Sequence, residues 1–452
     1  MVMILPQIQN NKLAFNIVLT YVFVLSLPYL GYTQNVTMTY EESRIITGGY
    51  ELPEYKSESS DSLLNSFLEE AYHQSDALKA AYQSWVAVRS QTDQVGSLPD
   101  PEVMFRYFIN PMKYDGPFAQ GSIGVMQMFP WFGTLDENRN YVNLLSHAKW
   151  QEVDSARLEV FEGVKTSWYR LVLVHRRKEY LKEHLEWVNR LMQLTRSRVE
   201  SGYASRSDML QLEMEKIEIE TMLEALNISF SSEQMRFNSL LNRNATQEVT
   251  LPTGRPEITW ELTYEETLNL AITHNPSILN LEILDQAGES MEKRAKLEGY
   301  PMIGVGAEIM GRNSSMQMDG NRIPIYANVT IRLPIWRKKY KAILSQAQAE
   351  RKVIEYEISD KIRSFQAEIS SLMSVYKEAD VRVKRYRDAL LPKSRELTDL
   401  LLLDYSNARI RLDEVIQMRR RSVEYATMLE EAIFDRNMAT VSLQRFTAGV
   451  EF

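Results

Sequence analysis

One stretch of the chain, within an expected strand at about 325–334, alternates strictly between apolar and polar residues. The apolar residues fall on one face: Ile325, Ala327, Val329, Ile331 and Leu333. A period of two predicts a β-strand with one apolar and one wet side. Similar stretches lie at about 102–110, 121–130 and 302–310, although the second of these is less regular. Each is near the roughly 9–11 residues with which a tilted strand crosses a bilayer.

The long stretches after each strand pair follow the helical period instead. Apolar residues recur there at intervals of three and four over about 65 residues, which favours a narrow apolar stripe and coiled-coil packing. At 1.5 Å per residue, each stretch would extend roughly 100 Å. Helices are also expected before each strand pair, at roughly 61–97 and 263–298. A plain helical bundle would explain the stripes but not the recurring strand pairs.

The two halves of the chain follow one plan. Pro130 and Pro334 each end the second strand of a pair. The turn-like sequences SGYASRSDML (201–210) and NARIRLDEVI (407–416) follow in the same order. Anchors that keep their order and nearly keep their spacing indicate an old duplication of a helix, two strands, a long helix and a second helix.

This plan divides the chain into a signal peptide (1–34), an N-terminal extended segment (35–60), a first repeat (61–243), a linker (244–262), a second repeat (263–447) and a C-terminal tail (448–452). Lys12 precedes an apolar run at 13–30, the pattern of a signal peptide. A membrane anchor is the alternative, because the run is near the length that spans a bilayer. Polar residues within the run favour the signal peptide.

The four strands raise a question of closure. They cannot form a transmembrane barrel alone, because the smallest such barrels need about eight strands. If they lie in a membrane, several chains must pool them, and three chains would supply twelve. The alternative is a soluble four-stranded sheet that caps a helical domain. The expected fold class is mainly α with a small membrane β part.

With this plan, the chain resembles the TolC-like family of outer-membrane efflux proteins over about residues 60–447. The resemblance rests on the duplicated order of elements, on the two strand-to-helix prolines, and on the tip-like turns at 200–213 and 405–420. The stretch 385–405 is similar to the branch that exports heavy-metal ions, and Pro392 matches a proline usual there.

The resemblance implies a homotrimer with a twelve-stranded β-barrel in the outer membrane of a Gram-negative bacterium, continued by a long α-helical barrel in the periplasm. It implies the passive exit duct of a tripartite efflux pump, with heavy-metal ions as candidate substrates. The implied partners are a periplasmic adaptor (membrane fusion) protein, an inner-membrane efflux pump and outer-membrane lipid. A periplasmic coiled-coil adaptor or scaffold protein is the alternative, although it should show one helical hairpin between compact β-rich domains.

The resemblance also implies functional positions on the two turns. The residues expected at the periplasmic tip, where an adaptor docks, are Gly202, Tyr203, Ser205, Arg206, Asp208, Asn407, Ala408 and Arg409. Ala408 stands where the family usually has glycine. The candidates for the periplasmic gate are Asp413, Glu414 and Gln417. A ring of carboxylates would attract cations at a constriction, whereas a solvated helix start is the alternative for these residues.

Proline and aromatic residues mark both strand-to-helix junctions, at Pro130, Trp131, Pro334 and Trp336. Proline ends a hydrogen-bonded ladder, and amphipathic rings concentrate at a bilayer boundary. In the first copy, Thr134 and Glu137 have the spacing of a capping box. In the second copy, the cationic sequence WRKKYK opposes the helix dipole and would suit anionic headgroups.

Composition removes several other classes of function. The chain has no cysteine, and its net charge of −8 disfavours nucleic acid as a partner. Its five histidines form no i+3 or i+4 pair, and no catalytic or phosphate-binding motif stands out, so neither an enzyme nor a cofactor is expected. Thioethers suit Cu(I) or Ag(I), and the candidate ligands are Met126, Met128, Met316 and Met318. Packing is the preferred interpretation of these methionines.

Overall fold

The computed structural model describes Tyr55 and residues 61–112, 119–312 and 325–448. The expected signal peptide, almost all of the N-terminal extended segment, and Met316 and Met318 lie outside these described residues.

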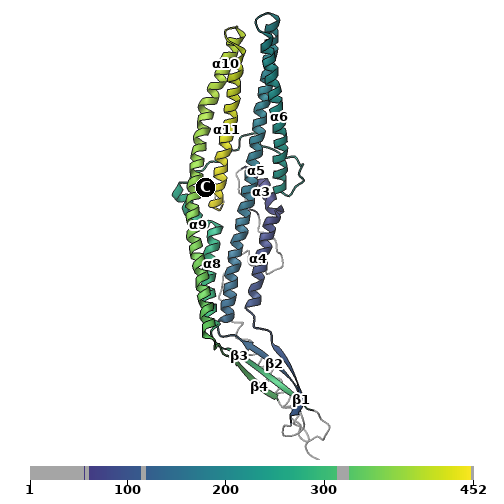
Figure 1. The fold of residues 1–452 in the computed structure, drawn as a ribbon, viewed down its shortest axis with the longest axis vertical. Helices are drawn as coiled ribbons and strands as arrows, with labels where there is room; N and C mark the ends of the chain where they lie inside the picture. Colours follow the sequence, from purple (N-terminus) through teal and green to yellow (C-terminus); the bar gives the residue numbers. More distant parts are fainter. Residues whose placement is uncertain (1–54, 56–60, 113–118, 313–324, 449–452) are drawn as a thin grey trace, which may run out of the picture. The chain divides into compact units, whose positions relative to one another are not determined.

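In the first repeat, two helices precede a strand pair and two follow it, and the strands lie at one end of the helices (Figure 1). Its elements, in chain order, are α3 (Ser62–Gln74), α4 (Asp76–Val95), β1 (Glu102–Met112), β2 (Ala119–Phe129), α5 (Thr134–Glu200) and α6 (Arg206–Leu240). The long helix α5 has 67 residues, and it begins five residues after the strand that precedes it. It packs against α4, α6, α8 and α11.

The second repeat has the same order of elements. They are α7 (Tyr264–His274), α8 (Pro276–Leu297), β3 (Met302–Arg312), β4 (Ile325–Arg332), α9 (Arg337–Arg385), the π-helix η2 (Tyr386–Leu390), α10 (Leu391–Ser406) and α11 (Leu412–Phe446). The long helical stretch is therefore interrupted in this copy, directly before Pro392. Proline has no N–H to donate to the carbonyl four residues earlier, and the N–H of Leu391 bonds instead to the carbonyl of Tyr386, five residues back.

The helix before each strand pair is broken in two, which corrects the expectation of continuous helices at 61–97 and 263–298. Ser75 ends α3 and caps α4, and Asn275 ends α7 and caps α8. Each has an extended backbone, and each side chain accepts a backbone N–H of the next helix, from Leu78 at 3.3 Å and from Ser277 at 2.9 Å. The two breaks are 200 positions apart, so they belong to the repeated plan.

The four strands form one antiparallel sheet in the order β1-β2-β3-β4. The register places apolar residues in rows across one face, which we call the outer face. One row, from β1 to β4, consists of Phe105, Ile123, Ile309 and Ile325. Side chains of the outer face are exposed, to 76% at Phe105 and 69% at Val329. The opposite, inner face carries polar and methionine side chains.

The interior of the molecule lies between the helices. One cluster joins the α5–α6 and α10–α11 hairpins around Val188, Leu212 and Val415, which are fully buried. Another joins α7 and α8 to α9 and α11 around Ile278 and Ile369. The first cluster joins the two hairpins, and the second attaches α7 and α8 to the long helices of the second repeat.

Candidate functional site

The turns that end the two long hairpins have the same backbone hydrogen bonds. In the first turn, Gly202 donates to the carbonyl of Val199 at 3.1 Å, and Tyr203 donates to Arg198 at 2.8 Å. In the second turn, the bonds that correspond at an offset of 206 join Ala408 to Tyr405 and Arg409 to Asp404, both at 2.9 Å. The two expected tip turns therefore share one conformation.

Ala408 takes the left-handed backbone conformation that its glycine counterpart takes. Its φ is 59°, and that of Gly202 is 79°. A side chain at such a φ costs roughly 1–2 kcal/mol, because Cβ approaches the following carbonyl oxygen. The change of residue type in the second copy thus keeps the turn and adds local strain.

A buried arginine connects the two turns. Arg198, near the end of α5, donates to the carbonyl of Tyr405 in the second turn and to that of Tyr203 in the first, the latter at 3.2 Å. Its guanidinium lies 4.4 Å from the centre of the Tyr405 ring, and the hydroxyl of that ring lies 3.1 Å from the hydroxyl of Thr195. The spacing of apolar residues in the sequence does not predict the contact between Arg198 and Tyr405. The helical period identifies the apolar face of a helix but not which cation is buried beside it.

The residues expected to dock an adaptor lie on the two turns that Arg198 and Tyr405 connect. Tyr203 is 73% exposed, and Arg206, Asn407, Ala408 and Arg409 are exposed as well. Ser205 and Asp208 have a local role, because they form a reciprocal capping box at the start of α6, with bonds of 3.0 and 3.3 Å. Arg409 pairs with Asp404 at 3.3 Å. The exposed tyrosine and Arg206 are therefore the side chains most available to a partner.

The gate candidates lie on the first turns of α11. Glu414 and Gln417 are exposed and three positions apart, so they share a face of the helix. Asp413 is half-buried and lies 3.1 Å from Arg411. The neighbouring residue Val415 is fully buried in the core between the hairpins. The face with Glu414 and Gln417 therefore points away from the chain's own core.

A buried carboxylate, Glu215 of α6, connects three helices. His184 of α5 lies 3.0 Å from its Oε1, and Arg420 of α11 donates to its Oε2 from Nε at 2.7 Å. Burial favours the neutral form of this carboxyl, but the hydrogen bonds from His184 and Arg420 and the charge of Arg420 outweigh it and lower the pKa of Glu215.

One polar cluster on the inner face of the sheet draws a side chain from every strand. Glu308 of β3 is 5% exposed and accepts from Arg106 of β1 at 2.9 Å, from the hydroxyl of Ser122 of β2, and from Asn328 of β4 at 3.3 Å. Arg106 and Glu308 each lie between apolar residues that alternate along their strands, so both fall on the polar side. The contact between them depends on the register across three strands, which a single sequence does not give.

The methionines of β2 lie together on the inner face. Met126 and Met128 are both at least 91% buried. A Cβ built on Gly304 would meet the Met128 sulfur at 2.6 Å and the Met126 sulfur at 3.0 Å, so both thioethers cover this glycine of β3. This arrangement supports packing. Within the residues that the structure describes, no group of three or more His, Cys, Asp or Glu could hold a metal ion.

The strand-to-helix junctions differ between the two repeats. In the first, Gly133 is the N-cap of α5 with φ 82°, and no side chain caps the helix. The expected capping box of Thr134 and Glu137 is therefore wrong, because the chain turns into the helix one residue earlier than the box requires. Trp131 stacks on Tyr300 of the second repeat, with ring centroids 5.1 Å apart and planes at 16°. Trp336, in the second junction, is 74% exposed.

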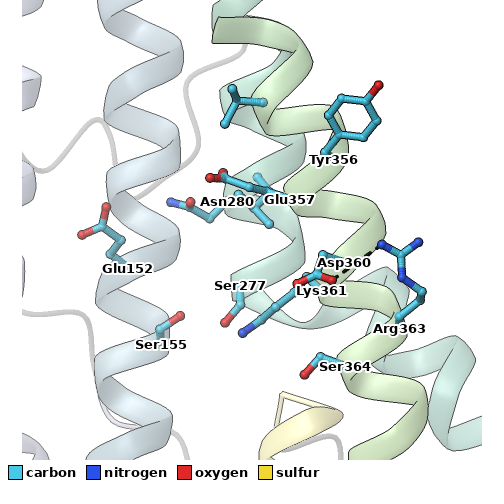
Figure 2. Close-up of a pocket in the computed structure, with 12 residues that line it drawn as sticks. Glu152, Ser155, Ser277, Asn280, Tyr356, Glu357, Asp360, Lys361, Arg363 and Ser364 are labelled. Carbon is cyan, nitrogen blue, oxygen red and sulfur yellow. Dashed lines mark ion pairs between the residues drawn. The ribbon is translucent and has the colours of Figure 1, made fainter.

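A groove of about 890 Å³ lies between α5, α8 and α9 (Figure 2). Its polar lining carries both signs of charge, with Glu152 on α5 and the pair Asp360–Arg363 on α9. Tyr356, on its rim, is 73% exposed. No sequence pattern marks this groove, and its mixed charge defines no ligand.

No family model and no curated protein matches the sequence. Solved structures do match. The outer-membrane channel OprN is 16% identical, with a TM-score of 0.73 over 89% of this chain and 94% of that chain. The outer-membrane protein VceC of Vibrio cholerae is 14% identical, with a TM-score of 0.70 over 85% and 96% of the two chains. CusC, whose structures are described in terms of transmembrane channel formation, is 14% identical. Its TM-score is 0.71 over 88% of this chain and 95% of that chain.

This chain has the fold of these solved outer-membrane proteins. The likeness spans nearly the whole length of each matched chain, so it includes the strand pairs as well as the long helices. The TM-scores of these three structures are nearly equal. They therefore do not favour the heavy-metal-exporting branch over any other branch of these channels. Among the described residues, no helix is both long and apolar enough to cross a membrane.

Proposed function

We propose that this protein is one subunit of a homotrimeric exit duct in the outer membrane of a Gram-negative bacterium. In this proposal, three four-stranded sheets close a twelve-stranded barrel, and the long helices continue it as an α-helical barrel in the periplasm. The duct conducts substrates passively and is not an enzyme.

The observation that carries this proposal is the difference between the two faces of the sheet. The outer face exposes apolar side chains from all four strands, whereas on the inner face Glu308 is buried and bonds to polar side chains of the other three strands. A lipid-facing wall around a polar interior has this alternation. Strands β1 and β4 are the edges of the sheet, and each is free to pair with another copy.

Two unpartnered apolar stripes support assembly of the helices. Along α6, the exposed residues are Leu210, Met214, Ile217, Ile228 and Met235. Along α9 and α10, they are Val353, Tyr356, Val381, Leu397, Leu400 and Leu403. On α6 the intervals are four, three, eleven and seven, which is the pattern of a seam between helices, and on α10 the three leucines recur at intervals of three. A neighbouring copy would cover them.

The ends of the hairpins are the proposed docking site for a periplasmic adaptor, which would join the duct to an inner-membrane efflux pump. Tyr203 and Arg206 supply an exposed ring and an exposed cation there. The proposed gate is the threefold repetition of Glu414 and Gln417 around the axis, because both residues face away from the core of their own chain. Heavy-metal ions are the substrate class that we propose to test first.

Cysteine crosslinking tests the assembly, since the chain has no cysteine of its own. Met214→Cys on α6 and Leu400→Cys on α10, placed in one chain, should give crosslinked dimers and trimers in membranes. Ser229→Cys in place of Met214→Cys is the control, since Ser229 is exposed but lies one residue after Ile228, about 100° around the helix from the stripe. A protein that stays soluble after cell lysis and runs as a monomer would refute the duct.

Conductance and sensitivity measurements test the transport function. Purified protein in a planar bilayer should give single-channel currents that favour cations, and Glu414→Gln should weaken that preference. Deletion of the gene should sensitise cells to the exported class, whether copper, zinc or cobalt salts, dyes or antibiotics. A periplasmic adaptor, the alternative function, would give no conductance.

A further inference from the structure

A cationic groove lies at the second strand-to-helix junction, and neither the fold nor the proposed duct accounts for it. It has a volume of about 830 Å³ and is lined by the end of α8 and the residues after it, the segment between β4 and α9, and the start of α9. The side chains that give it its character are Lys296, Tyr300, Leu333, Ile335, Arg337 and Lys341. Three of these are cations and three are apolar or aromatic.

The cations of this groove have no anionic partner within the described part of the chain. Lys296, Arg337 and Lys341 are exposed, and no carboxylate forms an ion pair with any of them there. Lys338 and Lys339 add two more positive charges on the same turn of α9, which contains no acidic residue. The groove is therefore a concentrated and uncompensated positive site.

The position of these cations is unfavourable for the helix itself. The start of a helix carries a partial positive charge and unpaired N–H groups, so cations there repel and anions are stabilised. The equivalent helix of the first repeat follows this rule, with Asp136 and Glu137 in its first turn. In the second repeat, Arg337 and three lysines take their place. An anion bound here would offset the repulsion between these cations and the positive end of the helix dipole.

The apolar walls define which anion fits. Leu333 is 61% exposed and Ile335 66% exposed, beside the cations. Val329 and Ile331 continue the same apolar surface along β4, with exposures of 69% and 58%. On the other wall, Tyr300 is held by its stacking on Trp131. A free phosphate ion would use only the cations, whereas a lipid would place its phosphate among them and its acyl chains along β4.

We propose that this groove binds the headgroup of one anionic glycerophospholipid per subunit, in the leaflet that faces the periplasm. The choice of leaflet rests on the proposed function, because the groove lies at the helical end of the strands. Lys296, Arg337 and Lys341 contact the phosphate, and the apolar end of β4 contacts the first part of the acyl chains. The first repeat has no such site, since its junction is acidic.

Native mass spectrometry of the full-length protein in a neutral detergent tests the proposal. The probes are dioctanoylphosphatidylglycerol, dioctanoylphosphatidylcholine and inorganic phosphate. Each basic residue near an anionic surface contributes on the order of 1 kcal/mol, so the anionic lipid should bind roughly tenfold or more tightly than the zwitterionic lipid. The triple variant K296Q/R337Q/K341Q should lose that preference.

The matched control is K352Q/K377Q/R385Q, which removes two lysines and one arginine that are exposed on α9 outside the groove. It should keep the preference. The thermal midpoint of the groove variant should be unchanged or raised, since neutral side chains relieve repulsion at the start of α9, and this separates lost binding from lost folding. Equal binding by the two triple variants, or equal binding of the two lipids, overturns the proposal. If inorganic phosphate displaces the anionic lipid at concentrations similar to those at which the lipid itself binds, the apolar surface along β4 does not contribute to binding.

The same samples separate this proposal from the proposed function. Oligomeric state and conductance are measured for each variant. Intact channels without a lipid preference would refute the lipid site alone. A monomeric, non-conducting protein that still prefers the anionic lipid, and loses this preference in the groove variant, would refute the duct and leave the site.

Discussion

The guanidinium of Arg198 donates to the backbone carbonyl of Tyr405 and lies 4.4 Å from the centre of its ring. The same side chain donates to the carbonyl of Tyr203, so one arginine bonds to the backbone of both turns. The two hairpins come from different repeats, and this contact fixes the spacing of their ends.

The first prediction concerns this contact. Arg198→Lys keeps the charge but loses the planar fork that reaches two carbonyls, and it should cost about 1–2 kcal/mol of stability at the tip. Hydrogen exchange of the amides at 200–206 and 406–412 should become faster. Arg196→Lys is the control, because Arg196 is exposed. Equal exchange in the two variants would show that Arg198 does not hold the turns.

Ala408→Gly should stabilise the second turn. Glycine adopts the φ of 59° without strain, and after its larger loss of backbone entropy the net gain should be about 0.5–1 kcal/mol. The reverse change in the first turn, Gly202→Ala, should destabilise by a similar amount. Chemical denaturation of both variants measures the effect, and a loss of stability in Ala408→Gly would contradict the strain.

Stability should depend on pH through Glu215. Its pKa is lowered in the folded protein, so its contribution is present above the unfolded value of about 4.3 and is lost as the pH falls through the folded value. Glu215→Gln should lower the thermal midpoint at neutral pH, and the difference from wild type should shrink in acid. Glu224→Gln, on the exposed surface of the same helix, is the control. Its thermal midpoint should differ from that of wild type by the same small amount at neutral and acid pH.

The Glu308 cluster should show strong coupling between its members. Glu308→Gln leaves Arg106 without its carboxylate and should destabilise the sheet by about 1–3 kcal/mol. Arg106→Gln leaves a buried carboxylate and should cost at least as much, whereas the double variant should cost less than the sum of the two. The midpoint of thermal unfolding in detergent measures each effect, and simple additivity would mean that the two side chains act independently.

Sequence patterns predicted the strands and the long helices because each has one apolar side, and the period of that side identifies the element. The breaks at Ser75 and Asn275 were missed because the apolar spacing continues across them. Their capping chemistry was visible only as a polar residue before Asp76 or Pro276. The contacts of Glu308 and Arg198 could not be predicted, since the first needs the strand register and the second needs the packing of two repeats.

Within the described residues, the order β1-β2-β3-β4 leaves a strand with unpaired backbone groups at each end of the sheet. A newly made chain on its own therefore presents two unpaired edges beside an apolar face, and either edge can pair with a wrong strand. Only a closed ring of subunits would remove both edges at once. The final step of folding for this chain should therefore depend on the concentration of its own copies, and aggregation should compete with it whenever that concentration is reached away from a lipid surface.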